Sequence, residues 1–453
     1  MKIINPATEE VIKDVEPTPT EKMAQYHGHA LQAQKQWAQV SINDRLKVLD
    51  SYEKRVKDQR DELARLLTLE TGKPISQARN EVTGSLDRVR HLKRYAHKWL
   101  ESEVLSTGDV LEFVCYEPLG VIANISAWNY PYNVGYNVFL YALTAGNAVL
   151  YKPSEYATLT GLKIAELLEE SGLPGHLFNV IVGDGSAGQQ LLELPLDAYF
   201  FTGSHRTGLE IAKSVAPKLV PLQLELGGKD PLYVMEDVAD VKQAAINAAE
   251  GAFYNNGQSC CAIERIYVHE AIYQDFVSHF VSAVKGYQIG DPMSEQTFIG
   301  PLTRSEQLGV FEKQCADALA KGAKLLLGGK RIQGKGFYFE PTIFVDVNHD
   351  MDLMKSESFG PIIGIQKVTD DSEALGLMDD TEYGLTASVF SADESRARTL
   401  LDQLDVGTAY WNCCDRVSPN VPWSGRRHSG LGSTLGASGI RTFTKPKAYH
   451  WKN

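Results

Sequence analysis

The chain has 453 residues, of which 43% are hydrophobic and 23% are charged, a composition typical of a globular protein with two or three domains. Its 57 acidic and 45 basic residues give a net charge of −12, which disfavours nucleic-acid and anionic-membrane binding because phosphate contacts require clustered Lys and Arg. No run of 18 apolar residues and no zinc-type cysteine spacing occurs, so we expect a cytoplasmic protein with no membrane span and no bound metal.

The first hundred residues are predicted to be helical, and the next segment is predicted to be extended. Residues 20–104 combine many charges with spaced apolar positions, as amphipathic helices do. Residues 105–118 contain β-forming and turn residues instead, a pattern that favours strands.

From residue 119 onward, short apolar runs alternate with helical stretches. Strands that are buried on both faces and alternate with helices predict a parallel, doubly wound sheet. Ligands bind such sheets at the carboxyl ends of the strands. We therefore expect one edge of this sheet to carry Asn129, Lys152, Gly183, Gly203 and Glu225.

A second α/β unit is predicted to begin near Pro231. Strand patterns at 231–235 and 264–269 flank a helical pattern at 240–256, and a further helix is predicted at 272–287. The chain ends on another strand pattern, "RTFTKPKAYHW", which is expected to pair with another segment or another chain.

Polar motifs at the expected strand ends are ambiguous when each is taken alone. Adjacent Cys260 and Cys261 more often fill a core than perform chemistry. Gly203 in "FTGS" is expected to permit a tight turn before a helix. Two glycines after Glu225 in "ELGGKDP" are expected to leave that carboxylate uncrowded, as a general base requires. Taken alone, "YKPSE" would suit the start of a helix, and "ESFGP" would suit a loop.

Taken together and in order, the motifs resemble those of the NAD(P)-dependent aldehyde dehydrogenase superfamily. The likeness extends from "INPAT" at Ile4 to "TKPKAYHW" at the end. Between these ends lie "ISAWNYP", "YKPSE", "FTGS", "ELGGKDP", "FYNNGQSC", "ESFGP" and "PWSGRRHSGLG". The set is far more specific than any single dinucleotide-binding fingerprint.

The resemblance implies an α/β fold with three parts. A Rossmann-type doubly wound domain that binds the cofactor is expected at 1–98 and 119–227. A second α/β domain, which is catalytic in the family, is expected at 228–434. A β arm that serves oligomerisation is expected at 99–118 and 435–453.

Catalytic roles follow from the same resemblance. Cys260 matches the family nucleophile, and Asn129 matches the amide that completes the oxyanion hole with the backbone N–H of Cys260. Glu225 matches the general base that activates water for hydrolysis of the thioester. Because acylating relatives that use CoA tend to lack this base, hydrolysis is the favoured outcome.

Cofactor contacts are implied for nine residues. These are Trp128, Lys152, Glu155, Gly183, Gly203, Ser204, Leu226, Glu357 and Phe359. Glu155, three residues after Lys152, suits a ribose 2′-hydroxyl and repels a 2′-phosphate. We therefore expect NAD as the cofactor, with NADP less favoured.

The resemblance places the substrate funnel along eight residues. These are Tyr130, Val134, Asn137, Ser259, Cys261, Asp415, Val417 and Trp423. Asn137 stands where many relatives have an aromatic residue, which suggests a small polar aldehyde. Trp423 and Tyr130 suit a cation, whereas Arg416 suits a carboxylate, so amino- or betaine-type aldehydes and semialdehydes both remain open.

Two other interpretations are compatible with the sequence. The first is a CoA-acylating or reductive member of the superfamily. The second is a non-catalytic structural or binding protein on the same scaffold, which the presence of Cys260, Glu225 and Asn129 argues against. The arm predicts a homo-oligomer, with a dimer favoured over a tetramer.

Overall fold

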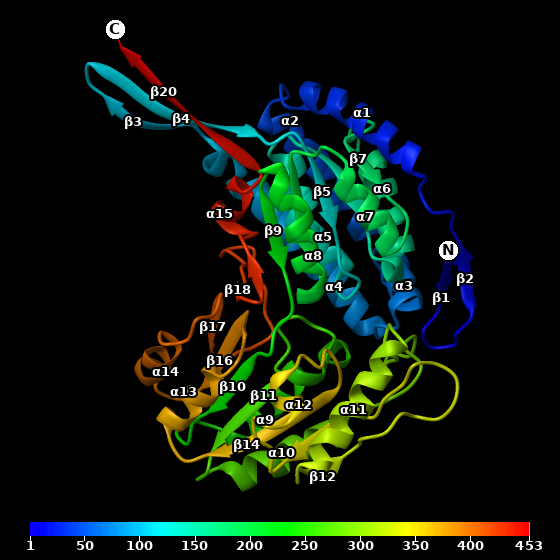
Figure 1. Ribbon diagram of the computed structural model, residues 1–453, viewed down its shortest axis with the longest axis vertical. Helices are drawn as coiled ribbons and strands as arrows, with labels where there is room; N and C mark the ends of the chain where they lie inside the picture. The colour runs from blue at the N-terminus through cyan, green and yellow to red at the C-terminus, as the bar shows by residue number, and fades with distance from the viewer. Residues whose placement is uncertain (453) are drawn as a thin grey trace.

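The computed structural model describes residues 1–452. Figure 1 shows two α/β units, one above the other, with a β arm projecting from the upper unit. A hairpin formed by β1 (Lys2–Ile4) and β2 (Val11–Asp14) lies beside the upper unit near the N-terminus. No helix among residues 1–452 is both long enough and apolar enough to cross a membrane.

The upper unit is built on a six-stranded sheet. In sheet order the strands are β19 (Gly430–Leu431), β9 (Leu222–Glu225), β8 (Ala198–Thr202), β5 (Val121–Ile125), β6 (Ala148–Lys152) and β7 (Phe178–Val180). All neighbours pair in parallel except β19, which is antiparallel to β9. β5 and β6 are buried along their whole length, which explains why their sequences are apolar apart from Asn124 and Lys152.

Helices pack on this sheet and on one another. They are α1 (Thr20–Trp37), α2 (Ile42–Asp58), α3 (Arg60–Thr71), α4 (Ile75–Leu100), α5 (Pro131–Thr144), α6 (Thr158–Glu170), α7 (Gly185–Glu193), α8 (His205–Val215) and α15 (Gly436–Arg441). The longest, α4, packs against α2, α3 and α5 and belongs to the same hydrophobic core as the sheet. Gly72, in the left-handed region at φ 78°, ends α3.

The lower unit is built on a seven-stranded sheet. Its order is β12 (Lys324–Leu327), β13 (Thr342–Val345), β14 (Ile362–Val368), β11 (Arg265–His269), β10 (Pro231–Val234), β16 (Thr386–Phe390) and β17 (Thr408–Trp411). Only β12 runs antiparallel to its neighbour. The helices of this unit are α9 (Val241–Phe253), α10 (Tyr273–Lys285), α11 (Glu306–Ala320), α12 (Asp352–Lys355), α13 (Asp371–Asp379) and α14 (Glu394–Leu401).

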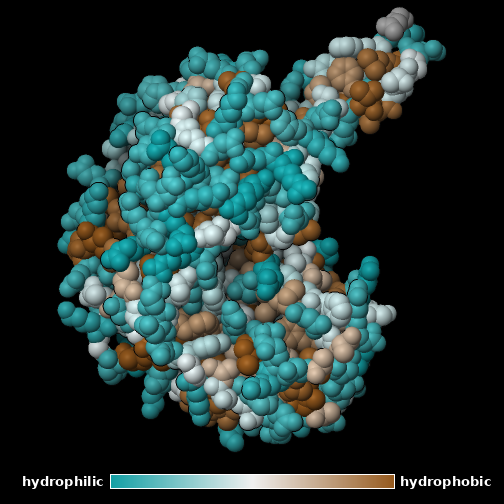
Figure 2. Space-filling model, turned by 180° about the vertical axis from the view of Figure 1, so that it is seen from behind, coloured by the Kyte–Doolittle hydropathy of each residue, from teal (hydrophilic) through white to brown (hydrophobic). Residues whose placement is uncertain are grey.

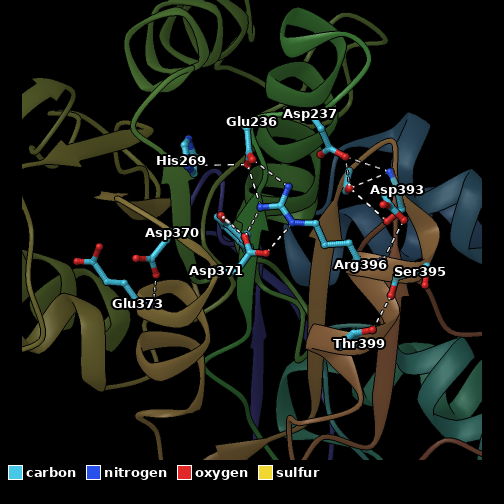
Figure 3. Close-up of polar contacts among 12 residues, drawn as sticks. Glu236, Asp237, His269, Asp370, Asp371, Glu373, Asp393, Ser395, Arg396 and Thr399 are labelled. Carbon is cyan, nitrogen blue, oxygen red and sulfur yellow. Dashed lines mark hydrogen bonds and ion pairs between the residues drawn. The ribbon is translucent and has the colours of Figure 1, made fainter.

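A charged cluster fastens α13 and α14 to the end of β10. Figure 3 shows Arg396 of α14 between Asp371 of α13 and Glu236, which follows β10. Its guanidinium donates to both oxygens of Asp371 at 2.6 Å and to both oxygens of Glu236 at 2.9 and 3.2 Å. Tyr233 of β10 also donates to Asp371, at 2.9 Å.

The arm is a three-stranded antiparallel sheet. Its order is β20 (Thr444–Lys452), β4 (Val110–Pro118) and β3 (Glu103–Thr107). Phe113 and Tyr449 stack with their ring centroids 4.6 Å apart, and Trp451 meets Phe113 edge-on. Figure 2 shows hydrophobic atoms gathered on this projection.

Most predicted elements form where the sequence indicates them. The parallel sheets, α9, α10 and the final strand are confirmed, although the N-terminal helical region ends at Leu100 and β3 begins at Glu103. The proposed domain boundaries stay a prediction. β19 falls inside the range expected for the catalytic domain, yet it pairs with the first sheet.

Candidate active site

A cavity of about 630 Å³ lies between the two units. Asn129, Glu225 and Cys260, the predicted catalytic residues, all line it. So do the eight residues predicted for the substrate funnel, namely Tyr130, Val134, Asn137, Ser259, Cys261, Asp415, Val417 and Trp423. Segments more than a hundred residues apart in the chain therefore meet in one space.

The loop that carries Cys260 has an unusual backbone. After α9 ends, Asn255, Asn256 and Gly257 adopt left-handed conformations at φ 53°, 57° and 67°. Side-chain hydrogen bonds hold this turn, since the Asn256 amide donates to the carbonyls of Gly300 and Pro301 at 2.7 and 3.0 Å. A Cβ on Gly257 would lie 2.5 Å from the Gly360 carbonyl oxygen, so only glycine fits there.

The two adjacent cysteines have different surroundings. Cys261 is buried, and its Sγ donates to Asp415 Oδ1 at 3.1 Å, while Cys260 is only partly buried. Ser259 Oγ donates to the same Asp415 oxygen at 2.8 Å. The hydrogen bond with Cys260, together with burial, raises the pKa of the Cys261 thiol. Burial also raises the pKa of Asp415 to about 6.

Asn129 is held by the loop that carries Cys260 and by Lys73. Its Nδ2 donates to the Gln258 carbonyl at 3.2 Å. Its own backbone carbonyl accepts from Asn255 Nδ2 at 3.2 Å and from Lys73 Nζ at 2.7 Å. Lys73 is also ion-paired with Glu81 in the protein interior.

Lys73 and Glu81 are contributors that the sequence reasoning missed. Glu81 Oε1 accepts the backbone N–H of Tyr132 at 3.0 Å, so the pair clamps the turn that contains Asn129. Gln77, Glu81, Ser85 and Arg88 recur at helical spacing on α4 and are all buried. In the sequence this polar stripe resembles a solvent-facing helix surface, so no sequence signal indicates its burial.

Glu225 ends β9 at the edge of the cavity. Gln223 Nε2 donates to its Oε1 at 3.0 Å. Burial raises the pKa of Glu225 well above its ordinary value, although the hydrogen bonds from Trp423 and Gln223 oppose that rise. A carboxyl group with a raised pKa is suited to accept a proton near neutral pH.

Gly227 and Gly228, which follow Glu225, are required by neighbours other than Glu225. A Cβ on Gly227 would lie 2.1 Å from Glu357 Oε1, and one on Gly228 would lie 2.5 Å from Asp230 Oδ1. These glycines therefore make room for Glu357 and Asp230 rather than for Glu225. Gly228 N–H donates to Glu357 Oε1 at 3.1 Å, and burial raises the pKa of Glu357 to about 8.

The residues predicted for the adenosine end gather after β6 and β7. Lys152, the last residue of β6, is buried, and its Nζ donates to the Pro153 carbonyl at 3.2 Å and lies 4.0 Å from Glu155 Oε2. Burial lowers the pKa of Lys152. Gly183 precedes α7 at φ 153°, and a Cβ there would lie 2.4 Å from the Cβ of Ala187.

Gly203 and Ser204, two of the residues predicted to contact the cofactor, lie immediately before α8. Ser204 caps this helix by accepting the N–H of Thr207 at 3.3 Å. Gly203 lies in the turn between β8 and α8, as expected, and its φ is not positive. A Cβ there would lie 2.4 Å from the ring of Phe201.

The remaining three predicted contacts complete the cleft. Phe359 and Trp128 meet edge-on with centroids 5.6 Å apart, and Phe359 has φ 52°. Glu264 accepts the N–H groups of Ser358 and Phe359 at 2.8 and 2.7 Å, which fixes this loop. Leu226 lines the cavity itself.

These residues suit a dinucleotide. The buried Lys152 ends one strand, with the Glu155 carboxylate 4.0 Å away, and a capped helix start follows another strand. Positive charge and free N–H groups therefore lie at the carboxyl ends of parallel strands. Within residues 1–452, no cluster of three His, Cys, Asp or Glu side chains could hold a metal ion.

Comparison with known proteins gives a consistent result. Residues 1–449 match the aldehyde dehydrogenase family. An aminoaldehyde dehydrogenase of Arabidopsis thaliana is 35% identical over 98% of this chain and 91% of its own length. A solved NAD-dependent aldehyde dehydrogenase from Sinorhizobium meliloti is 32% identical, with a TM-score of 0.97 over 100% of this chain and 91% of that one. A solved NADP-dependent enzyme of E. coli is 29% identical, with a TM-score of 0.97 over 100% of this chain and 94% of that one.

Proposed function

The chain belongs to the aldehyde dehydrogenase family and is an NAD(P)-dependent oxidoreductase, and from this premise we propose that Cys260 attacks the aldehyde and Glu225 completes its conversion to a carboxylate. The observation that carries the proposal is the shared cavity, which brings Cys260, Asn129 and Glu225 together.

The first step is addition of the Cys260 thiolate to the carbonyl carbon, which places negative charge on the carbonyl oxygen. Asn129 Nδ2 and the backbone N–H of Cys260 donate to that oxygen. The Lys73–Glu81 pair supports this step by fixing the backbone of Asn129. One such oxyanion donor is worth about 3–4 kcal/mol of barrier.

The second half converts the adduct into product. The chemistry that a bound nicotinamide supplies is acceptance of a hydride from the substrate carbon, which leaves a thioester on Cys260. Glu225 then takes a proton from a water molecule, and the resulting hydroxide attacks the thioester carbon. The bond to sulfur breaks, which releases the carboxylic acid and restores the Cys260 thiolate, and the acid then loses its proton to solvent as the carboxylate leaves.

We assign the cofactor to the cleft formed by the strand ends, with NAD preferred. Lys152 and Glu155 hold the adenosine ribose, the start of α8 holds the pyrophosphate, and Glu357 and Phe359 orient the nicotinamide half. Glu155 supports NAD because its carboxylate repels a 2′-phosphate.

The proposed substrate is a small polar aldehyde. The cavity is lined by Asn133, Asn137 and several charged side chains, which long aliphatic chains would leave without polar partners. Both an amino- or betaine-type aldehyde and a semialdehyde fit that description, and a relative named as an aminoaldehyde dehydrogenase supports the former.

The test is NADH formation from a panel of short aldehydes by wild type, Cys260→Ala and Cys261→Ser. We expect Cys260→Ala to lose turnover but still bind NAD in a fluorescence titration, and Cys261→Ser to keep most of its activity. Turnover by Cys260→Ala near the wild-type rate would remove Cys260 as nucleophile. A rate that required added CoA would replace hydrolysis by acyl transfer.

A further inference from the structure

The cavity contains both acidic and basic side chains. Its charged lining residues are Glu81, Asp87, Arg88, Glu225, Glu250, Asp415 and Arg416. Asp87, Glu250 and Arg416 are exposed at the surface, so they face water rather than the interior. The charges that a substrate meets inside the cavity are therefore the other four.

Two of the three inner acids already have partners in the chain. Glu81 is ion-paired with Lys73. Asp415 accepts from both Ser259 and Cys261. The third acid, Glu225, is the proposed base. The inner cation, Arg88, has no such partner.

Arg88 has no ionic partner. It is only 4% exposed, and no carboxylate of residues 1–452 lies within 4.0 Å of its guanidinium. Its Nε donates to Asn137 Oδ1 at 2.9 Å, and its Nη1 lies 3.5 Å from the Gly84 carbonyl oxygen. Burial lowers the pKa of Arg88 to about 10, so the group still carries its charge at neutral pH. A buried charge without a counter-ion is costly, and an anionic ligand removes that cost.

One face of the Tyr130 ring cannot bind a substrate cation, because a cation of the chain already occupies it. Lys73 Nζ lies 3.7 Å from the centroid of Tyr130, so the chain already places its own ammonium against that ring. The charge of Lys73 is balanced by Glu81, so the unpaired inner cation is Arg88, which would repel a substrate ammonium and attract a carboxylate. The local charges thus favour the semialdehyde over the amino-type aldehyde.

We propose that Arg88 binds the carboxylate at the far end of the substrate, so that the enzyme prefers aldehydes that carry an acid group. This inference rests on the proposed function, because it assumes that the aldehyde carbon lies at Cys260. Asn137 orients the guanidinium through Nε and leaves its terminal nitrogens to form the paired hydrogen bonds that a carboxylate accepts.

The first test compares 4-oxobutanoate, butanal and 4-aminobutanal as substrates of wild type, Arg88→Met, Arg88→Lys and Arg94→Met. We expect wild type to prefer 4-oxobutanoate in kcat/KM. Arg88→Met should lose about 10- to 100-fold on 4-oxobutanoate and little on butanal, since one charged hydrogen-bonded contact is removed. Arg88→Lys should retain part of the preference. Arg94→Met, an exposed change on the same helix but outside the cavity, is the matched control and should behave as wild type.

The second test adds a counter-ion instead of removing the guanidinium. Asn137→Asp places a carboxylate against Arg88 Nε, so it should abolish the preference while Arg88 stays in place. Glutarate should likewise inhibit wild type competitively and more strongly than butyrate, and this difference should vanish in both variants.

The outcomes separate this inference from the proposed function. No NADH from any aldehyde would refute the proposed function. Oxidation of butanal and 4-aminobutanal with no advantage for 4-oxobutanoate would refute the role of Arg88 alone, as would an unchanged preference in folded Arg88→Met or in Asn137→Asp.

Discussion

At the scale of single residues, neighbours in sequence acquire different chemistry from their contacts. Cys261 is buried against Asp415 and its thiol pKa is raised, so it is poorly suited to form a thiolate, whereas Cys260 lies at the cavity surface. The motif order led to the prediction that Cys260 is the nucleophile, but it gave no sign of the contact between Cys261 and Asp415, which depends on a loop 154 residues away.

Glu225→Gln should form the acyl-enzyme but hydrolyse it slowly. Because Glu225 must be deprotonated to act, the wild-type steady-state rate should rise as the pH rises through its elevated pKa. That rise should be absent in Glu225→Gln, which a pH series of NADH formation with a pre-steady-state burst would reveal. An undiminished steady-state rate would remove Glu225 as the base.

The same substitution has an expected effect on stability. Folding raises the pKa of Glu225, so the contribution of its protonated form is present at low pH and is lost as the pH rises through the folded pKa. Glu225→Gln should therefore melt at or above the wild-type temperature at pH 8. A lower melting temperature would mean that the activity loss reflects misfolding.

Glu155→Gln should shift cofactor preference towards NADP. The substitution removes the negative charge that would face a 2′-phosphate near Lys152 but leaves a hydrogen-bonding group. The ratio of kcat/KM for NAD to that for NADP should fall several-fold at subsaturating cofactor. Glu166→Gln, an exposed change on α6, serves as the control, and an unchanged ratio in Glu155→Gln would refute the assignment.

At the scale of elements, buried apolar strands were predictable and the polar side of α4 was not. β5 and β6 could be predicted because their residues are mostly apolar, with only Asn124 and Lys152 as clearly polar members. The buried Gln77, Glu81 and Arg88 of α4 look like solvent-facing residues in the sequence, because the partners that satisfy them come from distant segments. Sequence patterns report burial of apolar groups well and burial of paired polar groups poorly.

Lys73→Met should impair both stability and turnover. It leaves the Glu81 carboxylate buried and unpaired, a change that costs about 3–5 kcal/mol, and it frees the Asn129 carbonyl. Lys73→Met/Glu81→Gln removes the unpaired charge, so thermal unfolding should show recovered stability. Its kcat should stay low because Asn129 remains unclamped, and full recovery of kcat would contradict this positioning role.

Arg396→Met should loosen the cluster shown in Figure 3. Hydrogen bonds from Arg396 lower the pKa of Glu236, so this stabilisation is present above the ordinary pKa of 4.5 and is lost as the pH falls. We expect the melting temperature at pH 7 to fall by about 3 °C and the difference to shrink below pH 4. Arg398→Met on the same helix is the control, since Arg398 is 77% exposed and should change little.

At the scale of the whole molecule, the arm should mediate self-association. Val104, Leu105 and Trp451 are 59%, 67% and 55% exposed on the projecting strands, an arrangement that favours a covering partner. Light scattering should give two chains of 50.1 kDa per particle for wild type. Leu105→Glu should produce a smaller species, whereas Leu219→Glu, an exposed leucine on another surface, should not. An unchanged mass in Leu105→Glu would exclude the arm as the interface.

Because β9 pairs with β19, which lies near the end of the chain, the first sheet can be completed only late in synthesis. The first sheet receives its last strand only from residues 430–431, and β4 finds its partner β20 only at residues 444–452. The whole lower unit is translated between β9 and these closing strands. A nascent chain that has exposed only its first 230 residues on the ribosome therefore leaves two strand edges open, so we expect the amino-terminal unit to need protection from aggregation until the last residues emerge.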